Sequence, residues 1–294
     1  MPGTEPAAPA APARALTPQS GGPVAYAGEP GAFAEDAALA VFGDVERTGV
    51  GGFREVFEAV AAGRAAFGVI PIENLVNGTV RENYDLLLEH ELRIVGEVIV
   101  PVRLCLAALP GQRVDGVERV YSHIQALGQA ERFLRSRQWT LLTTYNTAGA
   151  GKLIAERGEA AAAAVLSPRA AALFGLEILA ADIQDVPDNR TRFLVVTADA
   201  ASRPPADGPQ RTTLAFGVRN EPGSLLRALR VFADREVNLS RLESRPSRAS
   251  AWEYIFWTDA DGAAGDPNVA GALDDLRAVT TSVRVLGSYP RASD

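Results

Sequence analysis

Four segments of the chain place small or polar residues where a predicted strand gives way to a predicted helix. They are residues 28–32 (GEPGA), 73–79 (ENLVNGT), 122–125 (SHIQ) and 146–150 (NTAGA). Each leaves unpaired backbone N–H groups at the positive end of a helix, and ligands of open α/β sheets bind where such ends meet. Several of these helix starts around one cleft would hold a small polycarboxylate with few cationic side chains. The chain has a single lysine, Lys152.

Two of these helix starts are also explained without any ligand. Ser122 and Gln125 have the spacing of a capping box, which satisfies the first N–H groups of a helix. Asn146 or Thr147 is an ordinary N-cap residue. The sequence alone therefore leaves open whether these side chains bind a ligand or only begin helices.

The first two segments differ in what they indicate. Gly28 and Gly31 can serve a tight turn alone, and their spacing lacks the full dinucleotide-binding fingerprint. The chain contains no Walker motif either. Glu73 follows a predicted buried strand, so we expect its carboxylate to face a cleft rather than bulk solvent.

Residues 188–193 (DNRTRF) open the last predicted strand of the first 200 residues. In a regular strand Thr191 and Phe193 point to one face and Arg192 points to the other. Only one of these two sets can face a cleft. Composition alone would assign Thr191 to the β-branched residues that favour strands.

The composition excludes several classes of protein. The 294 residues include one cysteine, Cys105, and two histidines, so a disulfide framework and a multi-cysteine metal site are excluded and a histidine site is disfavoured. The net charge of −7 argues against nucleic acid as the main partner. No apolar run reaches the roughly 18 residues of a membrane span. With 47% hydrophobic residues, the chain is expected to fold into about two soluble domains.

The charge is unevenly distributed along the chain. Residues 211–294 contain 11 basic and 11 acidic side chains, so the whole net charge lies in residues 1–210. The overall field repels an anionic substrate, which therefore needs a local positive site.

The chain divides into four predicted regions. Residues 1–22, rich in Ala and Pro, are expected to form a disordered cytoplasmic tail rather than a secretory signal. Strands and helices alternate in residues 23–198, which favours a parallel or mixed sheet with helices on both faces. Residues 199–210 (DAASRPPADGPQ) form a linker. Residues 211–290 follow the βαββαβ order of a ferredoxin-like fold.

Apolar periodicity and turn residues place the individual elements. Residues 53–60, for example, repeat apolar side chains at the i, i+3, i+4 and i+7 positions of a helix. The predicted strands are 24–27, 66–72, strands within 92–109 interrupted at Pro101, 119–121, 141–144, 160–166, 192–197, 212–219, 237–244, 251–258 and 281–287. The predicted helices are 32–42, 53–62, 82–90, 123–135, 148–157, 168–174, 224–234 and 268–279.

Several short segments, in this order, match a known family. They are GEPGAFAEDAA (28–38), GVIPIEN (68–74), NGTV (77–80), YSHIQALGQ (121–129), NTAGAGKLIA (146–155), DNRTRF (188–193), NEPGSLLRAL (220–229) and ESRP (243–246). Together they resemble prephenate dehydratase fused to a C-terminal ACT domain, over about residues 23–289. The Thr-Arg-Phe and Glu-Ser-Arg-Pro segments, correctly ordered and spaced, make the resemblance specific.

The resemblance implies a two-lobed catalytic domain like that of periplasmic binding proteins. The second lobe, about residues 102–180, is inserted into the first, and the active site lies between the lobes. The implied reaction removes water and carbon dioxide from prephenate to give phenylpyruvate in L-phenylalanine biosynthesis, with no cofactor and no metal. The family assigns the acid role to the threonine of Thr-Arg-Phe, here Thr191. Arg192 then braces the cleft, or binds a carboxylate if the strand bends.

The same resemblance places the substrate-binding residues at helix starts and strand ends. They are Glu73, Asn74, Thr79, Ser122, His123, Gln125, Asn146, Thr147, Ala148, Arg192 and Phe193. Leu75 stands where the family usually has serine, and residues 32–34 (AFA) lack the hydroxyl pair often found there. Backbone N–H groups or Thr79 must replace these two carboxylate contacts. His123 suits either a base or a helix cap.

The C-terminal domain is expected to bind L-phenylalanine as an allosteric effector. The resemblance implies feedback inhibition, an effector site at an ACT–ACT interface, and a homodimer or homotetramer. The implied effector residues are Asn220, Pro222, Gly223, Ser224, Leu225, Glu243, Ser244, Arg245 and Pro246. A plain turn followed by an edge strand explains the same residues without a ligand.

Three other functions fit parts of the sequence. Residues 82–98 and 104–111 also resemble arogenate dehydratases, whose substrate carries an amino group in place of the keto oxygen, and no residue decides between the two substrates. A solute-binding protein of the same architecture would need a secretion signal and no ACT domain. A non-catalytic amino-acid sensor would leave Thr191 without a role.

Overall fold

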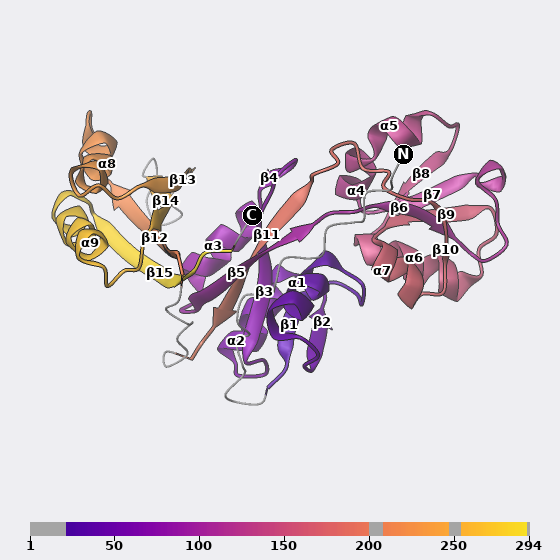
Figure 1. The fold of residues 1–294 in the computed structure, drawn as a ribbon, viewed down its shortest axis with the longest axis horizontal. Coiled ribbons are helices and arrows are strands. Elements are labelled where there is room, and N and C mark those ends of the chain that lie inside the picture. The colour runs from indigo at the N-terminus through magenta and orange to yellow at the C-terminus, as the bar shows by residue number, and fades with distance from the viewer. Residues whose placement is uncertain (1–21, 200–207, 247–253, 293–294) are drawn as a thin grey trace, which may run out of the picture.

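The computed structural model describes residues 22–199, 208–246 and 254–292, so almost all of the predicted tail and most of the predicted linker lie outside the described residues. Figure 1 shows three bodies in a row, with the C-terminal sheet at one end, the first lobe in the middle and the second lobe at the other end. No helix in the described ranges combines the length and the apolar character needed to cross a lipid bilayer.

The first lobe is built on a six-stranded sheet of order β2-β1-β3-β11-β5, with β4 paired to β3. Its strands are β1 (Val24–Ala27), β2 (Arg47–Val50), β3 (Phe67–Asn74), β4 (Gly78–Thr79), β5 (Arg93–Pro101) and β11 (Arg190–Thr197). Helix α1 (Phe33–Phe42) covers one face, while α2 (Phe53–Ala61) and α3 (Arg81–Glu89) cover the other. Since β11 is antiparallel to β3, the end of β3 and the start of β11 share one edge.

The second lobe is a five-stranded sheet of order β10-β6-β9-β7-β8. Its elements are β6 (Cys105–Ala108), the 3-10 helix η1 (Val114–Gly116), β7 (Arg119–Ser122), α4 (Ile124–Gln129), α5 (Glu131–Arg135), β8 (Thr140–Thr143), α6 (Thr147–Arg157), β9 (Ala162–Leu166), α7 (Pro168–Leu173) and β10 (Glu177–Ala180). Strands β7, β8 and β9 are parallel, so the helices that follow them begin at one edge of this sheet.

The chain passes between the lobes twice, after β5 and before β11. The two crossing segments are hydrogen bonded to each other: Val102 N–H donates to the Asn189 carbonyl over 2.8 Å, and Ile183 N–H donates to that of Leu104 over 2.9 Å. Thr191 therefore lies two residues beyond the crossing, where the two lobes meet.

The C-terminal domain has four antiparallel strands in the order β13-β14-β12-β15. They are β12 (Gln210–Val218), β13 (Leu239–Pro246), β14 (Tyr254–Asp261) and β15 (Ser282–Pro290), and the helices α8 (Ser224–Asp234) and α9 (Pro267–Val279) cover one face. The other face packs against α3 of the first lobe, where the Trp257 ring meets the Tyr84 ring edge-on at 4.8 Å. The predicted two-lobed α/β domain followed by a βαββαβ domain is confirmed.

The predicted helix over 123–135 is interrupted. It forms α4 and α5, which meet at Ala130 with φ −117° and ψ 24°. The Asp185 N–H donates to the Gln129 carbonyl, and the Asp185 carboxylate accepts from Arg132 N–H at 3.2 Å. A returning crossing segment thus replaces helical hydrogen bonds, which local sequence does not reveal.

Gly287 lets the C-terminal sheet lie directly on strand β5. A Cβ atom at this position would stand 2.0 Å from the Ile94 carbonyl oxygen. Since backbone carbonyls cannot rotate away as side chains do, any larger residue must push β15 and β5 apart.

We expect Gly287→Ala to lower the free energy of unfolding by about 1–3 kcal/mol, the usual cost of overpacking. Chemical denaturation followed by circular dichroism measures it. Gly265→Ala is the control, because a Cβ there meets nothing within 4 Å. Equal midpoints for the two variants would contradict this account of the domain contact.

Candidate active site

Asn74, at the end of β3, organises the edge of the first lobe. It is the cross-strand partner of Thr191. Its Nδ2 lies 3.0 Å from Thr191 Oγ1, 2.9 Å from Asn189 Oδ1 and 3.1 Å from the Arg190 carbonyl oxygen. One buried amide therefore holds three consecutive residues of the 188–193 segment.

The other end of the Asn74 amide holds the turn that follows β3. Its Oδ1 accepts from the N–H groups of Val76 at 3.0 Å and Asn77 at 2.9 Å. Gln129, at the end of α4 in the second lobe, also donates to it over 3.4 Å. Asn74 thus joins β3, the start of β11 and the second lobe.

The Thr191 hydroxyl is a hydrogen-bond donor without a partner of its own. Its oxygen accepts from Asn74, and within the described parts of the chain no group accepts its proton. The side chain lies at the meeting point of the lobes and is 8% exposed. This arrangement leaves its proton available to a ligand.

Helices α4, α6 and α7 of the second lobe begin at the same edge of its sheet, and a side chain caps the first turn of each. His123 Nδ1 accepts from Gln125 N–H at 3.3 Å, Asn146 Oδ1 from Gly149 N–H at 2.5 Å, and Ser167 Oγ from Ala170 N–H at 3.0 Å. Burial lowers the pKa of His123, which keeps the imidazole neutral and able to accept. His123 is therefore a helix cap.

Ser122 does not have the predicted capping role. Its hydroxyl donates to the Val165 carbonyl over 2.6 Å, and the side chain is fully buried between β7 and β9. With its proton used inside the sheet, Ser122 has only its hydroxyl oxygen left for the predicted substrate contact, which stays a prediction. Helix α6 begins at Thr147, one residue before the predicted start at Ala148, and Asn146 is its N-cap.

The glycine loop after β1 touches the second lobe directly. Glu29 accepts from Tyr145 and from Lys152, each over 3.0 Å. The Ser167 hydroxyl donates to the Gly31 carbonyl over 3.0 Å, and a Cβ on Gly31 (φ +88°) would stand 2.7 Å from Ala170. This side of the interlobe contact is therefore closed, and Gly31 is required for it.

The buried carboxylate of Glu35 is hydrogen bonded to that loop. Glu35 accepts from Gly31 N–H and from Arg169, both over 2.7 Å. Burial alone would raise the pKa of Glu35, but the Arg169 guanidinium and the Gly31 N–H lower it, so the group is ionised. The ion pair ties α1 of the first lobe to α7 of the second.

Three predicted substrate contacts lie on the opposite face of the sheet. Glu73 accepts from Arg241 at 2.6 Å, and Thr79 donates to Glu243 over 3.1 Å. Arg192, opposite Glu73 in the sheet, points the same way. These side chains face the C-terminal domain, so the structure does not bring Glu73, Thr79 and Arg192 together with Asn74 and Thr191.

Phe193 is also absent from the cleft. It is 2% exposed and packs in the core under α1 with Val195. In a regular strand Phe193 would point to the same face as Thr191, but the register shift between Arg192 and Phe193 interrupts this alternation. The structure therefore does not bring Phe193 together with Asn74 and Thr191.

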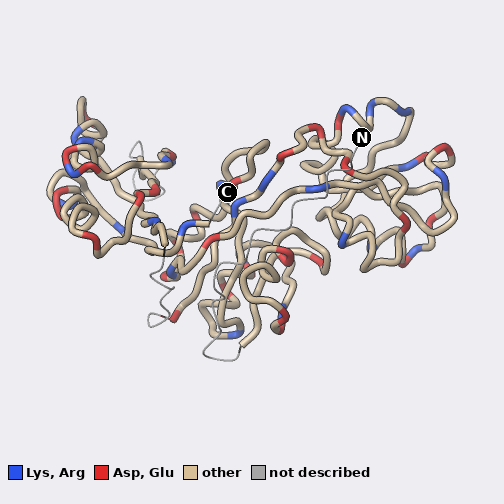
Figure 2. Tube along the Cα trace, viewed as in Figure 1, with Lys and Arg blue, Asp and Glu red and all other residues tan. Residues whose placement is uncertain are grey.

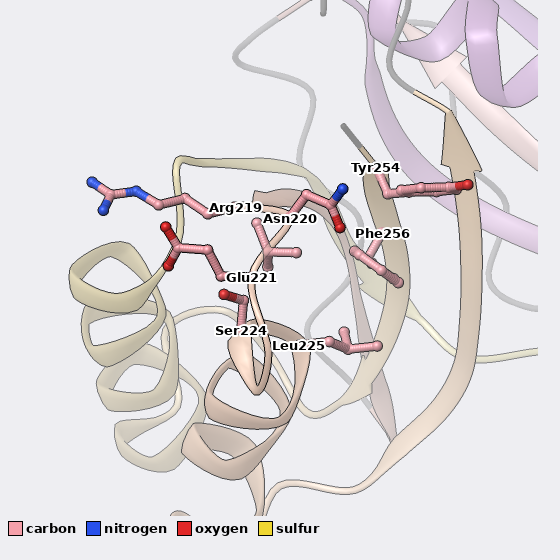
Figure 3. Close-up of a pocket in the computed structure, with 8 residues that line it drawn as sticks. Arg219, Asn220, Glu221, Ser224, Leu225, Tyr254 and Phe256 are labelled. Carbon is pink, nitrogen blue, oxygen red and sulfur yellow. The ribbon is translucent and has the colours of Figure 1, made fainter. Parts of the chain in front are cut away.

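The C-terminal domain has a small pocket at the start of α8. Its volume is about 130 Å³, and it is lined by Val218, Arg219, Asn220, Glu221, Ser224, Leu225, Tyr254 and Phe256. Figure 3 shows Asn220 and Leu225 near the two aromatic rings, with Arg219 and Glu221 pointing away from them. Three predicted effector residues, Asn220, Ser224 and Leu225, thus lie together, and Pro222 and Gly223 form the turn between them.

The ESRP segment divides between the two faces of its sheet. Ser244 and Pro246 pair with the pocket residues Phe256 and Tyr254. Glu243 and Arg245 alternate with them and contact the first lobe, where Arg245 donates to Asp85 over 2.7 Å. Glu243 and Arg245 therefore do not line this pocket, and their effector role at an ACT–ACT interface stays a prediction.

Comparison with known proteins identifies the catalytic region. The prephenate dehydratase family model matches residues 24–201, and the ACT domain model matches residues 212–278. The chain belongs to the prephenate dehydratase family. It is 40% identical over 284 residues to arogenate dehydratase 2 of Petunia hybrida, covering 92% of this chain and 72% of that protein. The bifunctional chorismate mutase/prephenate dehydratase of Aquifex aeolicus is 39% identical over 272 residues, covering 92% and 74%.

Solved structures of the family have the same fold. The prephenate dehydratase of Arthrobacter aurescens in complex with L-Phe gives a TM-score of 0.83 at 35% identity, covering 91% of this chain and 90% of that one. A protein described as GqqA, a novel type of quorum quenching acylase, gives 0.84 at 34% identity, covering 92% and 98%. As a member of the dehydratase family the chain is a carbon–oxygen lyase.

Three residues near the site were missed by the sequence reasoning. Asn189 and Gln129 surround the Asn74 amide, and Ser167 joins the lobes. Asn189 and Gln129 both lie inside segments that match the dehydratase family, which was the available signal. Ser167 precedes Pro168 at a helix start, an N-cap pattern. No cluster of side chains suited to a metal ion occurs in residues 22–199, 208–246 and 254–292.

Asn74→Asp is expected to lower kcat by about tenfold or more, because a carboxylate oxygen replaces the donor to Thr191 and meets the acceptor Asn189 Oδ1. Dehydratase assays and thermal unfolding on the same samples measure it. Asn83→Asp is the control: its Nδ2 donates to Pro71, away from the site, so it should cost stability but not kcat. Equal kcat losses in both variants would contradict the role of Asn74.

Proposed function

We propose that the chain converts prephenate to phenylpyruvate, with Thr191 as the group that assists departure of the ring hydroxyl. The observation that carries this is the Thr191 hydroxyl: its oxygen accepts from Asn74, and no group in the described residues accepts its proton. The side chain lies where the two lobes meet. Phenylalanine biosynthesis is the corresponding pathway.

The chemistry requires little from the protein. Loss of carbon dioxide sends an electron pair into the ring, hydroxide leaves from the opposite carbon with a proton, and aromaticity drives the step. The protein must hold the carboxylate that stays and donate to the departing oxygen. Holding the departing carboxylate would stabilise the ground state and slow the reaction. Thr191 donates a hydrogen bond to the departing oxygen while closure of the lobes excludes water, and the threonine oxygen regains a transferred proton from water when the lobes open.

The helix starts supply the positive potential for the remaining carboxylate. Helix α6 begins at Thr147 and Ala148, where backbone N–H groups are free of helical partners. Lys152 of the same helix lies near the glycine loop but is paired with Glu29. Backbone amides rather than Lys152 therefore hold the remaining carboxylate in this proposal.

The test is direct. Purified protein with prephenate should give phenylpyruvate, measured by its enol absorbance in base. Absence of product under conditions in which the chain is folded would reject the proposal.

Substrate preference is a separate question, since relatives are described both as arogenate dehydratases and as a chorismate mutase/prephenate dehydratase. We propose prephenate as the main substrate, with arogenate, which would give phenylalanine directly, as the alternative. Measuring kcat/KM on both compounds decides, and a larger value for arogenate would reverse the assignment.

We also propose that phenylalanine inhibits the enzyme by binding in the pocket at the start of α8. The Arthrobacter aurescens relative is described in complex with L-Phe. The pocket offers α8 N–H groups and apolar rings, which suit the carboxylate and side chain of an amino acid. We propose a cytoplasmic homodimer or homotetramer joined through ACT domains, and sedimentation with and without phenylalanine tests its size.

A further inference from the structure

A buried cluster of charges joins β11 to the C-terminal domain. Arg192 donates to Glu97 Oε2 and Asp259 Oδ2, each over 2.6 Å, and to the Tyr289 hydroxyl over 3.1 Å. Glu97 belongs to the first lobe, whereas Asp259 and Tyr289 belong to the C-terminal sheet. The Asp259 side chain is 4% exposed. One guanidinium therefore holds both domains at once.

Two further residues of β12 complete the cluster. Arg211 Nη1 lies 2.7 and 2.8 Å from the two Glu97 oxygens, and Thr213 donates to Asp259 Oδ1 over 2.6 Å. Two guanidinium groups thus balance two carboxylates. Figure 2 shows basic and acidic positions gathered where the C-terminal domain meets the first lobe. Breaking a buried ion pair costs free energy, so the ion pairs of the cluster stay formed when the domains move slightly. The side chains of the cluster therefore follow the movement.

The strands that carry the cluster also line the pocket at the start of α8, called the ACT pocket below. Strand β14 carries Phe256 in the pocket and Asp259 in the cluster, three residues or about 10 Å apart. Strand β12 carries Thr213 in the cluster and Val218 in the pocket. A ligand that displaces either strand in the pocket therefore displaces the cluster.

On the side of the first lobe, the cluster includes the sequence neighbour of Thr191. Arg192 follows Thr191 in sequence, and the register shift between β11 and β3 comes directly after it. The position of Thr191 relative to the Asn74 amide depends on that short stretch of β11. Movement of the Arg192 guanidinium therefore changes the hydrogen bond between Asn74 and Thr191.

We propose that Arg192 is a positioning residue for Thr191, and that Asp259 transmits the occupancy of the ACT pocket to it. The inference rests on the proposed function, in which Thr191 assists the reaction and phenylalanine occupies the pocket. Bound phenylalanine stabilises a second arrangement of β12 and β14. In that arrangement Asp259 has moved, and the Arg192 guanidinium that is paired with it has moved too. The effect falls on kcat, because Thr191 and not the grip on the remaining carboxylate is displaced.

Asp259→Asn in the full chain tests the link, since asparagine keeps the size and an acceptor oxygen but removes the charge. Prephenate kinetics are measured across a phenylalanine titration, with phenylalanine binding measured by calorimetry. Saturating phenylalanine should lower wild-type kcat by about 5–150-fold, the usual range of allosteric coupling. In Asp259→Asn this fold-change between uninhibited and inhibited kcat should fall below about twofold, while phenylalanine affinity stays within about threefold.

Arg284→Gln is the matched control. Arg284 also joins the domains, donating to the carbonyls of Leu88 at 2.7 Å and His90 at 2.6 Å, but lies outside the cluster. It should keep full inhibition. Tyr289→Phe is the second variant should Asp259→Asn fold poorly: it keeps every charge, removes one hydrogen bond to Arg192, and should weaken inhibition of kcat partially.

The outcomes separate this inference from the proposed function. Full inhibition of kcat in both Asp259→Asn and Tyr289→Phe would overturn the inference and leave the dehydratase assignment intact. Loss of inhibition in Arg284→Gln as well, or loss of phenylalanine binding in Asp259→Asn, would also overturn it. A wild-type enzyme that makes phenylpyruvate but ignores phenylalanine would remove the proposed regulation and the inference together, and one that makes no phenylpyruvate would reject the dehydratase assignment itself.

Discussion

Replacing Thr191 with alanine should lower kcat for prephenate by about a hundredfold or more, within the usual 10²–10⁴-fold contribution of an acid. The hydroxyl proton has no protein acceptor among the described residues, whereas the oxygen is fixed by Asn74. Departing hydroxide therefore loses its only oriented donor from β11. KM should change little, since the remaining carboxylate is held elsewhere.

Thr191→Ser provides the control, because it restores a hydroxyl at the same carbon. It should recover most of kcat, and both variants should unfold within a few degrees of the wild type. The lost Asn74–Thr191 hydrogen bond is worth only about 0.5–1.5 kcal/mol. Near-normal turnover in Thr191→Ala would remove Thr191 from the mechanism.

Much of the fold follows from local sequence. Alternation of apolar strands and helices predicts β3, α6 and α8 with bounds within two residues of those observed. Strands β2 and β10 were not predicted, because they are short, contain no fully buried residue and lack an apolar pattern. Their existence depends on neighbouring strands.

The site was predictable in part. Asn74 and Thr191 were expected from motifs at a strand end and a strand start, and the structure pairs them. Glu73 and Arg192 lie away from that pair, because a strand has two faces and local sequence does not say which of them another domain covers. The C-terminal domain covers one, so their charges pair with Arg241 and Asp259.

The same alternation explains how one motif serves two purposes. Ser244 and Pro246 of β13 share a face with the pocket residues, while Glu243 and Arg245 reach the catalytic domain. Each pair of neighbours along β13 therefore links the pocket face to the domain contact. A sequence motif read as a single binding site is here a strand with two functional faces.

Glu97→Gln is expected to lower the free energy of unfolding by about 3–5 kcal/mol, the cost of removing one partner from a buried ion pair. Glu97 is 5% exposed and accepts from Arg192, Arg211 and Ala292 N–H. Without its charge, two buried guanidinium groups share only Asp259. Their attraction already lowers the pKa of Asp259 against the opposing effect of burial, and one carboxylate cannot compensate both.

Urea denaturation of the full chain measures the loss of stability in Glu97→Gln. Glu131→Gln is the control, because its pair with Arg135 is exposed on a helix surface and such pairs contribute little. The unfolding transition of Glu97→Gln should also separate into two steps, since the cluster joins the C-terminal domain to the first lobe. A single transition at the wild-type midpoint would show that apolar contacts such as Trp257 on Tyr84 hold the domains together without the cluster.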